Sequence, residues 1–251
     1  MHGIFSSTTG SRRTTASFGA RVKRSTIAAI ASVCNERGTP LHVDAAQSIG
    51  KVGIDLHAAG VALASLSAHK SYGPKGVGAL AISKRHALHL QPLLFGGGQE
   101  RGLRSGTLPT HQIVGMGAAF ELAAAGRSVE SARMRGLRDR LWEALVGAGG
   151  VLCNSDSAIC VPHILNVSFE DVEGESLLAD VRDHVAVSTG SACTSASQEP
   201  SYVLRALGRG ERLAEASLRF GLGRFTSADD VDVAAQTVIR ALARLRRIAA
   251  C

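Results

Sequence analysis

Residues 65–76 read SLSAHKSYGPKG, and this stretch says most about the fold of the 251-residue chain. It follows a short apolar run at 61–66 that is typical of a buried strand, and a Gly-Pro pair ends it with a turn. Ser67, His69 and Lys70 therefore follow the carboxyl end of a predicted strand, where open α/β sheets bind their ligands. A lysine there can bond to an aldehyde, and the serine and histidine can donate to a phosphate. A surface lysine beside an ordinary turn would give the same pattern.

A second predicted strand ends in a carboxylate. Residues 41–48 read LHVDAAQS, with Asp44 at the end of the apolar run. Asp44 has the charge that a protonated pyridine nitrogen needs as its partner, and Gln47 can donate to a neighbouring ring oxygen. Asp44 is equally suited to capping the turn or helix that follows, as aspartate often does.

A third segment, residues 187–197, reads VSTGSACTSAS. It has neither helical nor strand periodicity, so we predict a loop of small residues around Cys193. A cysteine in such a polar loop is exposed and able to ionise, whereas structural cysteines are typically buried and inert.

Together these segments resemble the cysteine desulfurases of the housekeeping iron–sulfur cluster assembly type, which use pyridoxal phosphate. Residues 96–107, 164–169 and 217–226 carry further motifs of that family in the same order, and the resemblance runs from about Ile27 to the carboxyl end. It implies an α/β fold of the aspartate aminotransferase-like type (fold type I), with a truncated large domain and a smaller α+β domain. It also implies transfer of sulfur from L-cysteine to iron–sulfur cluster or tRNA-thiolation acceptors, leaving L-alanine.

The resemblance assigns roles to the motif residues around the cofactor. Lys70 would form the Schiff base with pyridoxal phosphate and later remove the substrate's Cα proton. Asp44 and Gln47 would hold the cofactor ring, and Ser67 and His69 would hold its phosphate.

The resemblance also assigns residues to the substrate and to other subunits. Cys193 would accept the sulfur as a persulfide and could serve as a transient iron–sulfur ligand during transfer. Arg219 would clamp the substrate carboxylate with its planar fork, with a structural salt bridge as the alternative. Thr107 would reach the phosphate across a homodimer interface, although it is also placed to cap the helix that follows. Asn166 is expected to be structural, and an iron–sulfur scaffold protein is an expected partner.

The net charge, the hydropathy and the cysteines argue against several other classes of protein. The net charge of +7 comes mostly from five basic residues before position 25, and no basic stripe alternates with aromatics, so we expect no nucleic-acid partner. No apolar run is long enough for a membrane span. The five cysteines include no CxxC pair, which argues against a disulfide framework or structural zinc and favours a reducing compartment.

We expect residues 1–26 to be an unmatched leader, 27–128 a remnant of the large domain, 129–149 a connecting helix and 150–251 the small domain. The leader has the composition of a transit peptide, but an unrelated leader on a truncated gene is preferred. We therefore expect the cytoplasm, or the mitochondrial matrix if the leader is a transit peptide.

Relatives carry a stacking histidine and a positioning asparagine ahead of the matched region, and neither motif is found here. Activity could therefore be impaired.

Periodicity predicts helices at 27–36, 108–125, 129–146 and 174–182, with a final helix capped by Ser227. It predicts strands near 40–44, 61–67, 77–83, 164–169, 185–187 and 217–220, the first three in a parallel sheet.

Two other functions remain open. One is a different lyase or aminotransferase of the same fold, against which Cys193 argues. The other is an inactive remnant that acts at most as a dimerising or scaffold-binding module.

Overall fold

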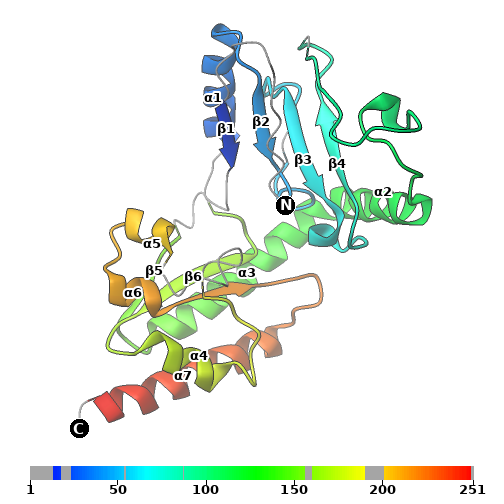
Figure 1. Ribbon diagram of the computed structural model, residues 1–251. Helices are drawn as coiled ribbons and strands as arrows, with labels where there is room; N and C mark the ends of the chain where they lie inside the picture. The colour runs from blue at the N-terminus through cyan, green and yellow to red at the C-terminus, as the bar shows by residue number, and fades with distance from the viewer. Residues whose placement is uncertain are drawn as a thin grey trace. The chain divides into compact units, whose positions relative to one another are not determined.

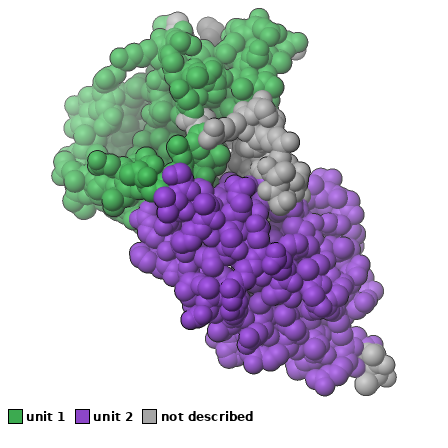
Figure 2. Space-filling model, turned by 180° about the vertical axis from the view of Figure 1, so that it is seen from behind, with its two compact units in different colours: residues 1–127 green, residues 128–251 purple. Residues whose placement is uncertain are grey.

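The computed structural model describes residues 14–17, 24–53, 55–86, 88–155, 160–189 and 201–249 (Figure 1). The chain divides into two compact units, Met1–Arg127 and Ser128–Cys251, which Figure 2 colours green and purple. The first carries the lysine motif and the second carries Arg219.

The first unit is built on a four-stranded sheet in the order β1-β2-β3-β4. The strands are β1 (Thr14–Ser17), β2 (Leu41–Asp44), β3 (Leu63–Ser67) and β4 (Gly78–Ile82). β1, β2 and β3 run parallel, which confirms the predicted parallel pairing of β2 with β3. β4 runs antiparallel to β3, so the prediction that it joins a parallel sheet was wrong. Ten residues separate β3 from β4, fewer than a parallel crossover needs, so the chain can only turn back on itself.

Part of the expected leader belongs to this sheet. No structure was predicted for residues 1–26, yet β1 lies within them and pairs with the whole of β2, from Thr14 opposite Leu41 to Ser17 opposite Asp44.

Helix α1 (Arg24–Glu36) supplies the core of the first unit. It begins three residues before the predicted start. Ile27, Ala31 and Cys34 lie on one helical face and are buried against β2 and β3. Gly38, with a φ of +62°, ends the helix in the left-handed conformation that glycine adopts at no steric cost.

Two short 3₁₀ turns and a long helix complete the first unit. They are η1 (Ala68–Ser71), η2 (Glu100–Gly102) and α2 (Thr110–Ala125). In Figure 1, α2 passes the carboxyl ends of the parallel strands, next to η1. It begins at Thr110 with Pro109 at its N-cap position, so the alternative in which Thr107 caps this helix was wrong.

The second unit contains a three-stranded antiparallel sheet in the order β5-β6-β7. Its strands are β5 (Val151–Cys153), β6 (Ile164–Phe169) and β7 (Ser217–Gly221). One face packs on the long helices α3 (Arg127–Val146) and α7 (Ala228–Ala249) and on α4 (Gly174–Val181). The core side chains of this face are all but inaccessible to water. They include Leu145, Val167, Phe169, Leu177 and Val238.

The opposite face of this sheet is polar. Strand alternation places Asn154, Asn166, Ser168 and Ser217 on one side, away from the apolar core. The segment that contains α5 (Tyr202–Ala206) and α6 (Glu211–Glu215) meets this side, where Arg209 bonds to Asn154 and Ser217 to Leu213.

Several predicted elements of the second unit are confirmed. β6 has the predicted bounds, and α4 ends one residue early. α3 begins two residues before the helix predicted at 129–146, and its buried side chains include Met134, Leu141 and Leu145. Residues 129–149 were expected to form a helix that connects the two domains. Instead, α3 packs into the core of the second unit.

Ser227 caps α7 as predicted. Its hydroxyl accepts from the amide of Asp230 at 3.1 Å, and the Asp230 carboxylate accepts from the amide of Ser227 at 2.8 Å.

The prediction of a strand at 185–187 was wrong. Ser188 makes a single antiparallel bridge to Arg219 in its place. Strand β5 and the short helices α5 and α6 were not predicted.

Among the helices that the structure describes, none is long and apolar enough to cross a membrane.

Candidate active site

The carboxyl ends of β2 and β3 lie next to each other in the first unit. Asp44 pairs with Ser65, and the amide of Ala45 donates to the carbonyl of Ser65 at 2.9 Å. Ser67 ends β3 two residues beyond this pair. The sheet register therefore brings the carboxylate and the start of the lysine turn to the same end of the parallel strands.

Asp44 is exposed, and one of its oxygens already has a structural partner. Its Oδ1 accepts from the amide of Ala46 at 3.0 Å, which is the turn-capping role that the sequence left open. A carboxylate has two oxygens, so this bond leaves Asp44 able to accept from a ligand as well. Gln47 is exposed in the turn that follows.

Ser67 and His69 face each other across the start of η1. The Ser67 hydroxyl and His69 Nδ1 are 3.0 Å apart, so the two predicted phosphate ligands bond to each other in this structure. Lys70 follows directly and is exposed.

The 3₁₀ turn that carries Lys70 is firmly held. Ala68 is completely buried beneath it, and its carbonyl accepts from the amide of Gly73 at 3.0 Å. Tyr72 ends the turn in the left-handed conformation, with a φ of 63°, which a non-glycine residue adopts only where the surroundings enforce it. A defined turn therefore supports Lys70.

The chemistry of this donor set fits pyridoxal phosphate. The sheet edge gathers an amine, a hydroxyl, an imidazole and a carboxylate, at Lys70, Ser67, His69 and Asp44. These groups match the aldehyde, the phosphate and the protonated ring nitrogen of that cofactor. The described ranges contain no cluster of His, Cys, Asp or Glu placed to hold a metal ion.

Thr107 lies in the connection between η2 and α2 and is exposed. This connection folds back on itself, because Gln99 Oε1 accepts from the amide of Gly106 at 3.0 Å. Ser105 lies in the same connection and is buried, so the protein around it holds the connection in place. Whether Thr107 serves a second subunit stays a prediction.

Arg219 lies in the middle of β7, in the second unit, and is half-buried. Its Nη2 donates to the hydroxyl of Ser188 at 3.4 Å. The cross-strand neighbour of Arg219 is Asn166, so the guanidinium belongs to the polar face of the sheet. No carboxylate partner is recorded for Arg219 among the described residues, which leaves the salt-bridge alternative without support.

The polar face around Arg219 is a buried hydrogen-bonded network. Asn154 Nδ2 donates to Asn166 Oδ1 and to the Ser168 hydroxyl, each at 2.7 Å. Arg209 Nε donates to Asn154 Oδ1 at 2.6 Å. Asn166 thus has the structural role that was predicted for it, whereas no sequence pattern indicated a role for Arg209 or Asn154.

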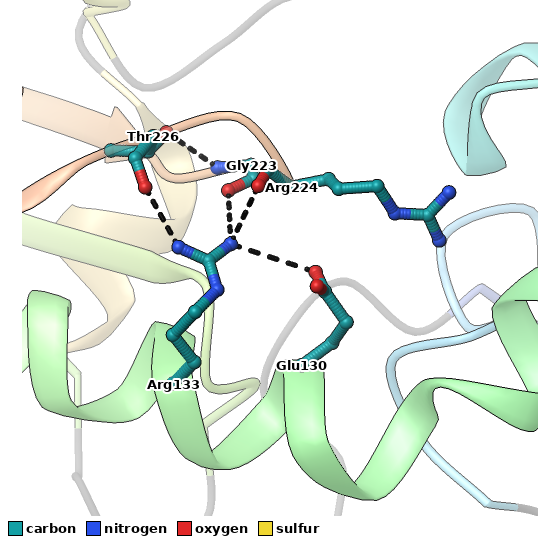
Figure 3. Close-up of polar contacts among 5 residues, drawn as sticks. All are labelled: Glu130, Arg133, Gly223, Arg224 and Thr226. Atoms are coloured by element: carbon teal, nitrogen blue, oxygen red, sulfur yellow. Dashed lines mark hydrogen bonds and ion pairs between the residues drawn. The ribbon is translucent and has the colours of Figure 1, made fainter.

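The loop that follows β7 is held by a side chain from α3 (Figure 3). The Arg133 guanidinium donates to the carbonyls of Gly223, Arg224 and Thr226 at 3.0, 2.8 and 2.7 Å, and it pairs with Glu130 at 3.6 Å. These three hydrogen bonds to the loop all go to backbone carbonyls. The end of the strand that carries Arg219 is therefore fixed.

Cys193, the predicted sulfur acceptor, lies outside the described residues. The structure describes the chain up to Thr189 and again from Ser201.

Comparison with known proteins places these motifs in a family. Residues 21–233 match the model of the family described as aminotransferase class-V. Over 222 residues the chain is 56% identical to a protein of Methylococcus capsulatus named cysteine desulfurase IscS and 54% identical to one of Pseudomonas putida with the same name. Each match covers 88% of this chain and 55% of the relative, so the chain spans about half the length of these relatives.

A solved structure titled NifS-like protein has the same fold over the matched part. Its TM-score is 0.78 at 33% identity, and the match covers 87% of this chain and 57% of that one.

Proposed function

Since this chain belongs to the aminotransferase class-V family, we propose that it is a pyridoxal-phosphate-dependent cysteine desulfurase. The observation that carries the proposal is the sheet edge at which β2 delivers Asp44 and β3 delivers Ser67, His69 and Lys70. The names of the relatives support the same reaction.

The first unit supplies the groups that would hold the cofactor. The Asp44 carboxylate would accept from the ring nitrogen, and the Gln47 amide would donate to the phenolic oxygen. Ser67 and His69 would exchange their mutual hydrogen bond, 3.0 Å long, for bonds to the phosphate. Each of these groups is wholly or partly exposed, so a ligand can reach it.

Lys70 would provide both the covalent anchor and the base. When bound, pyridoxal phosphate supplies an aldehyde that bonds to an amine and an electron-poor ring that weakens the bonds of an attached amino acid. The ε-amine of Lys70, once released by the substrate, would take the proton from the substrate Cα. The rigid turn beneath Lys70 would keep this amine in place.

Arg219 and Cys193 would handle the substrate. The Arg219 fork would bind the carboxylate of L-cysteine in a bidentate manner. The Cys193 thiolate would attack the substrate sulfur, so that an S–S bond forms while the substrate's C–S bond breaks. The sulfur then remains on Cys193 as a persulfide. The electron pair of the broken C–S bond stays with the carbon skeleton, which takes up a proton at Cβ, regains its proton at Cα and leaves as L-alanine.

We further propose that the working form is a homodimer in which Thr107 reaches the phosphate of the partner subunit's site. An iron–sulfur scaffold protein or another sulfur acceptor would then take the persulfide sulfur from Cys193, with transient iron ligation by the same thiol. The cysteine usage favours a reducing compartment such as the cytoplasm.

A second candidate is an inactive module that dimerises or binds a scaffold protein. The two candidates differ in whether the 251-residue chain binds the cofactor. As an inactive module the chain would bind little or no pyridoxal phosphate.

The decisive experiment measures the yellow absorbance of bound pyridoxal phosphate and the sulfide formed from L-cysteine with a thiol reductant. Lys70→Ala should lose both signals. Lys84→Ala removes an exposed lysine from the turn after β4 and should keep both. Absence of cofactor binding by the unaltered chain, even at high pyridoxal phosphate, would favour the inactive module.

A further inference from the structure

We propose that Ser71 is a positioning residue that locks the turn carrying Gln47 to the turn carrying Lys70. The inference rests on the proposed function, because it concerns how two of the cofactor-binding residues are held relative to each other. Ser71 itself has no contact with the cofactor in this proposal, and it acts through its neighbour Lys70.

The Ser71 hydroxyl makes one bond between these two turns. Its Oγ donates to the carbonyl of Ile49 at 3.1 Å, across 22 positions of sequence. Ser71 is 2% exposed, so water does not replace this bond when it breaks. Ile49 is two residues after Gln47, and Ser71 is one residue after Lys70, so the bond joins the backbones next to the two functional side chains.

A second contact joins the same two turns. The ammonium group of Lys51 lies 5.1 Å from the centre of the Tyr72 ring, within the range of a cation–π interaction. Lys51 lies two residues after Ile49, and Tyr72 lies directly after Ser71. Two adjacent ties, one polar and one cation–π, therefore connect one turn to the other.

Both turns also rest on helix α2. A Cβ added at Gly50 would come within 2.6 Å of the Ala123 Cβ, and one added at Gly73 would lie 3.2 Å from the Ala119 Cβ. Ala119 and Ala123 are four residues apart and lie on one face of the helix. The two turns are thus seated side by side on one helical surface, where neither has room for a larger residue.

This packing limits the distance of each turn from α2 but is non-directional, so sliding along the helix has to be resisted by another contact. The Ser71 bond is directional and fixes the register between the turns. When the Ser71 bond is lost, the distance between the Gln47 and Lys70 side chains is no longer fixed. It then need not equal the distance between the phenolic oxygen and the aldehyde of the cofactor ring. Misplacement of this kind weakens binding without unfolding the protein.

Ser71→Ala is the test variant, and Ser217→Ala is its matched control. Ser217 is also a buried serine, 1% exposed, whose hydroxyl donates to a backbone carbonyl, that of Leu213 at 2.6 Å. It lies in the other unit, so its loss should reduce stability without affecting the first unit. Ser71→Cys keeps a weaker donor at the same position.

Two measurements are made on the full chain. Hydrogen exchange of the apoprotein follows the amides of Lys51 and Val52, which both donate to the Ser48 carbonyl at 3.0 Å. Titration with pyridoxal phosphate, followed by its visible absorbance and by the pH dependence of that absorbance, gives the affinity and the environment at Lys70.

We expect Ser71→Ala to speed exchange of these two amides and to weaken cofactor binding roughly tenfold, with a shifted pH dependence. Ser71→Cys should fall in between, and Ser217→Ala should match the unaltered chain in both measurements. Unchanged exchange or unchanged affinity in Ser71→Ala would overturn the inference. If the unaltered chain does not bind the cofactor, the proposed function fails and the positioning role fails with it, while exchange still reports separately on the bond.

Discussion

Ser188 and Arg219 hold each other by three hydrogen bonds. The Arg219 amide donates to the Ser188 carbonyl at 2.7 Å, and the Ser188 amide donates to the Arg219 carbonyl at 3.2 Å. The Arg219 guanidinium adds a bond to the Ser188 hydroxyl at 3.4 Å. The residue proposed to bind the substrate is therefore tied, through backbone and side chain, to a residue five positions before Cys193.

Arg219→Lys should weaken the binding of L-cysteine. A lysine keeps the charge but has a single ammonium group, so it cannot grip a carboxylate with two parallel bonds. We expect the KM for L-cysteine to rise about tenfold or more, with cofactor absorbance unchanged. Arg212→Lys, at an exposed position of α6, is the matched control and should leave the KM unaltered. An unchanged KM in Arg219→Lys would remove this residue from the substrate site.

Cys193→Ser should separate cofactor binding from sulfur transfer. A hydroxyl cannot carry a persulfide, so sulfide release should vanish while the yellow absorbance persists. Cys153→Ser is the control, because serine can still donate to the Ser155 carbonyl that the Cys153 thiol contacts at 3.1 Å. Equal loss in both variants would contradict the assignment of Cys193 as the sulfur acceptor.

Asn154→Ala should destabilise the second unit. The change removes the amide that joins Asn166, Ser168 and Arg209, and with it three hydrogen bonds of a largely buried network. We expect the free energy of unfolding in urea to fall by about 2–3 kcal/mol. Asn35→Ala, which removes an exposed amide bonded to the Gly60 carbonyl and to His86 Nε2, should cost less than about 1 kcal/mol. A similar loss in the two variants would argue against a buried network.

Glu173 should make the second unit less stable in acid. Its carboxylate caps α4 by accepting from the amides of Ser176 and Glu175. The side-chain hydrogen bond from Ser176, and after it the bonds from these two amides, lower the pKa of Glu173 below its ordinary 4.5. Because the folded-state pKa is the lower one, this stabilisation is present above about pH 4.5 and is lost as the pH falls through the lowered value.

The measurement is the urea midpoint of the second unit's unfolding transition between pH 6 and pH 3, a range chosen to span both values. Glu173→Gln should flatten the decline of the midpoint at the acid end, since an amide does not titrate there. Glu211→Gln, in the first turn of α6, removes one carboxylate elsewhere and serves for comparison. An identical decline in Glu173→Gln and the unaltered chain would contradict the capping role.

The pattern of neighbouring residues in the sequence was sufficient to predict most of the helices and strands and the position of the lysine turn. The apolar runs at β2, β3 and β6, and the capping residues of α7, are encoded within a few positions of where they act. The placement of Asp44 beside the lysine turn followed from strand direction alone, because parallel neighbours end at the same edge.

The features that were missed depend on contacts between distant parts of the chain. The antiparallel β4 is decided by the length of its connection, and the bridge of Ser188 to Arg219 spans 31 positions. Ser71 has no distinguishing pattern in sequence, because its partner is a backbone carbonyl 22 positions away. The individual roles of the motif residues stay predictions, and Cys193 lies outside the described residues.

The hydrogen bonds from Arg133 to the loop after β7 determine which positions can be substituted during evolution. The three loop contacts of Arg133 are with main-chain oxygens, which any amino acid possesses. Substitutions in the loop can therefore accumulate without releasing it, whereas a change at Arg133, some 90 positions earlier, would release three carbonyls at once. The conformation of the loop therefore depends more on Arg133 of α3 than on the side chains of the loop itself.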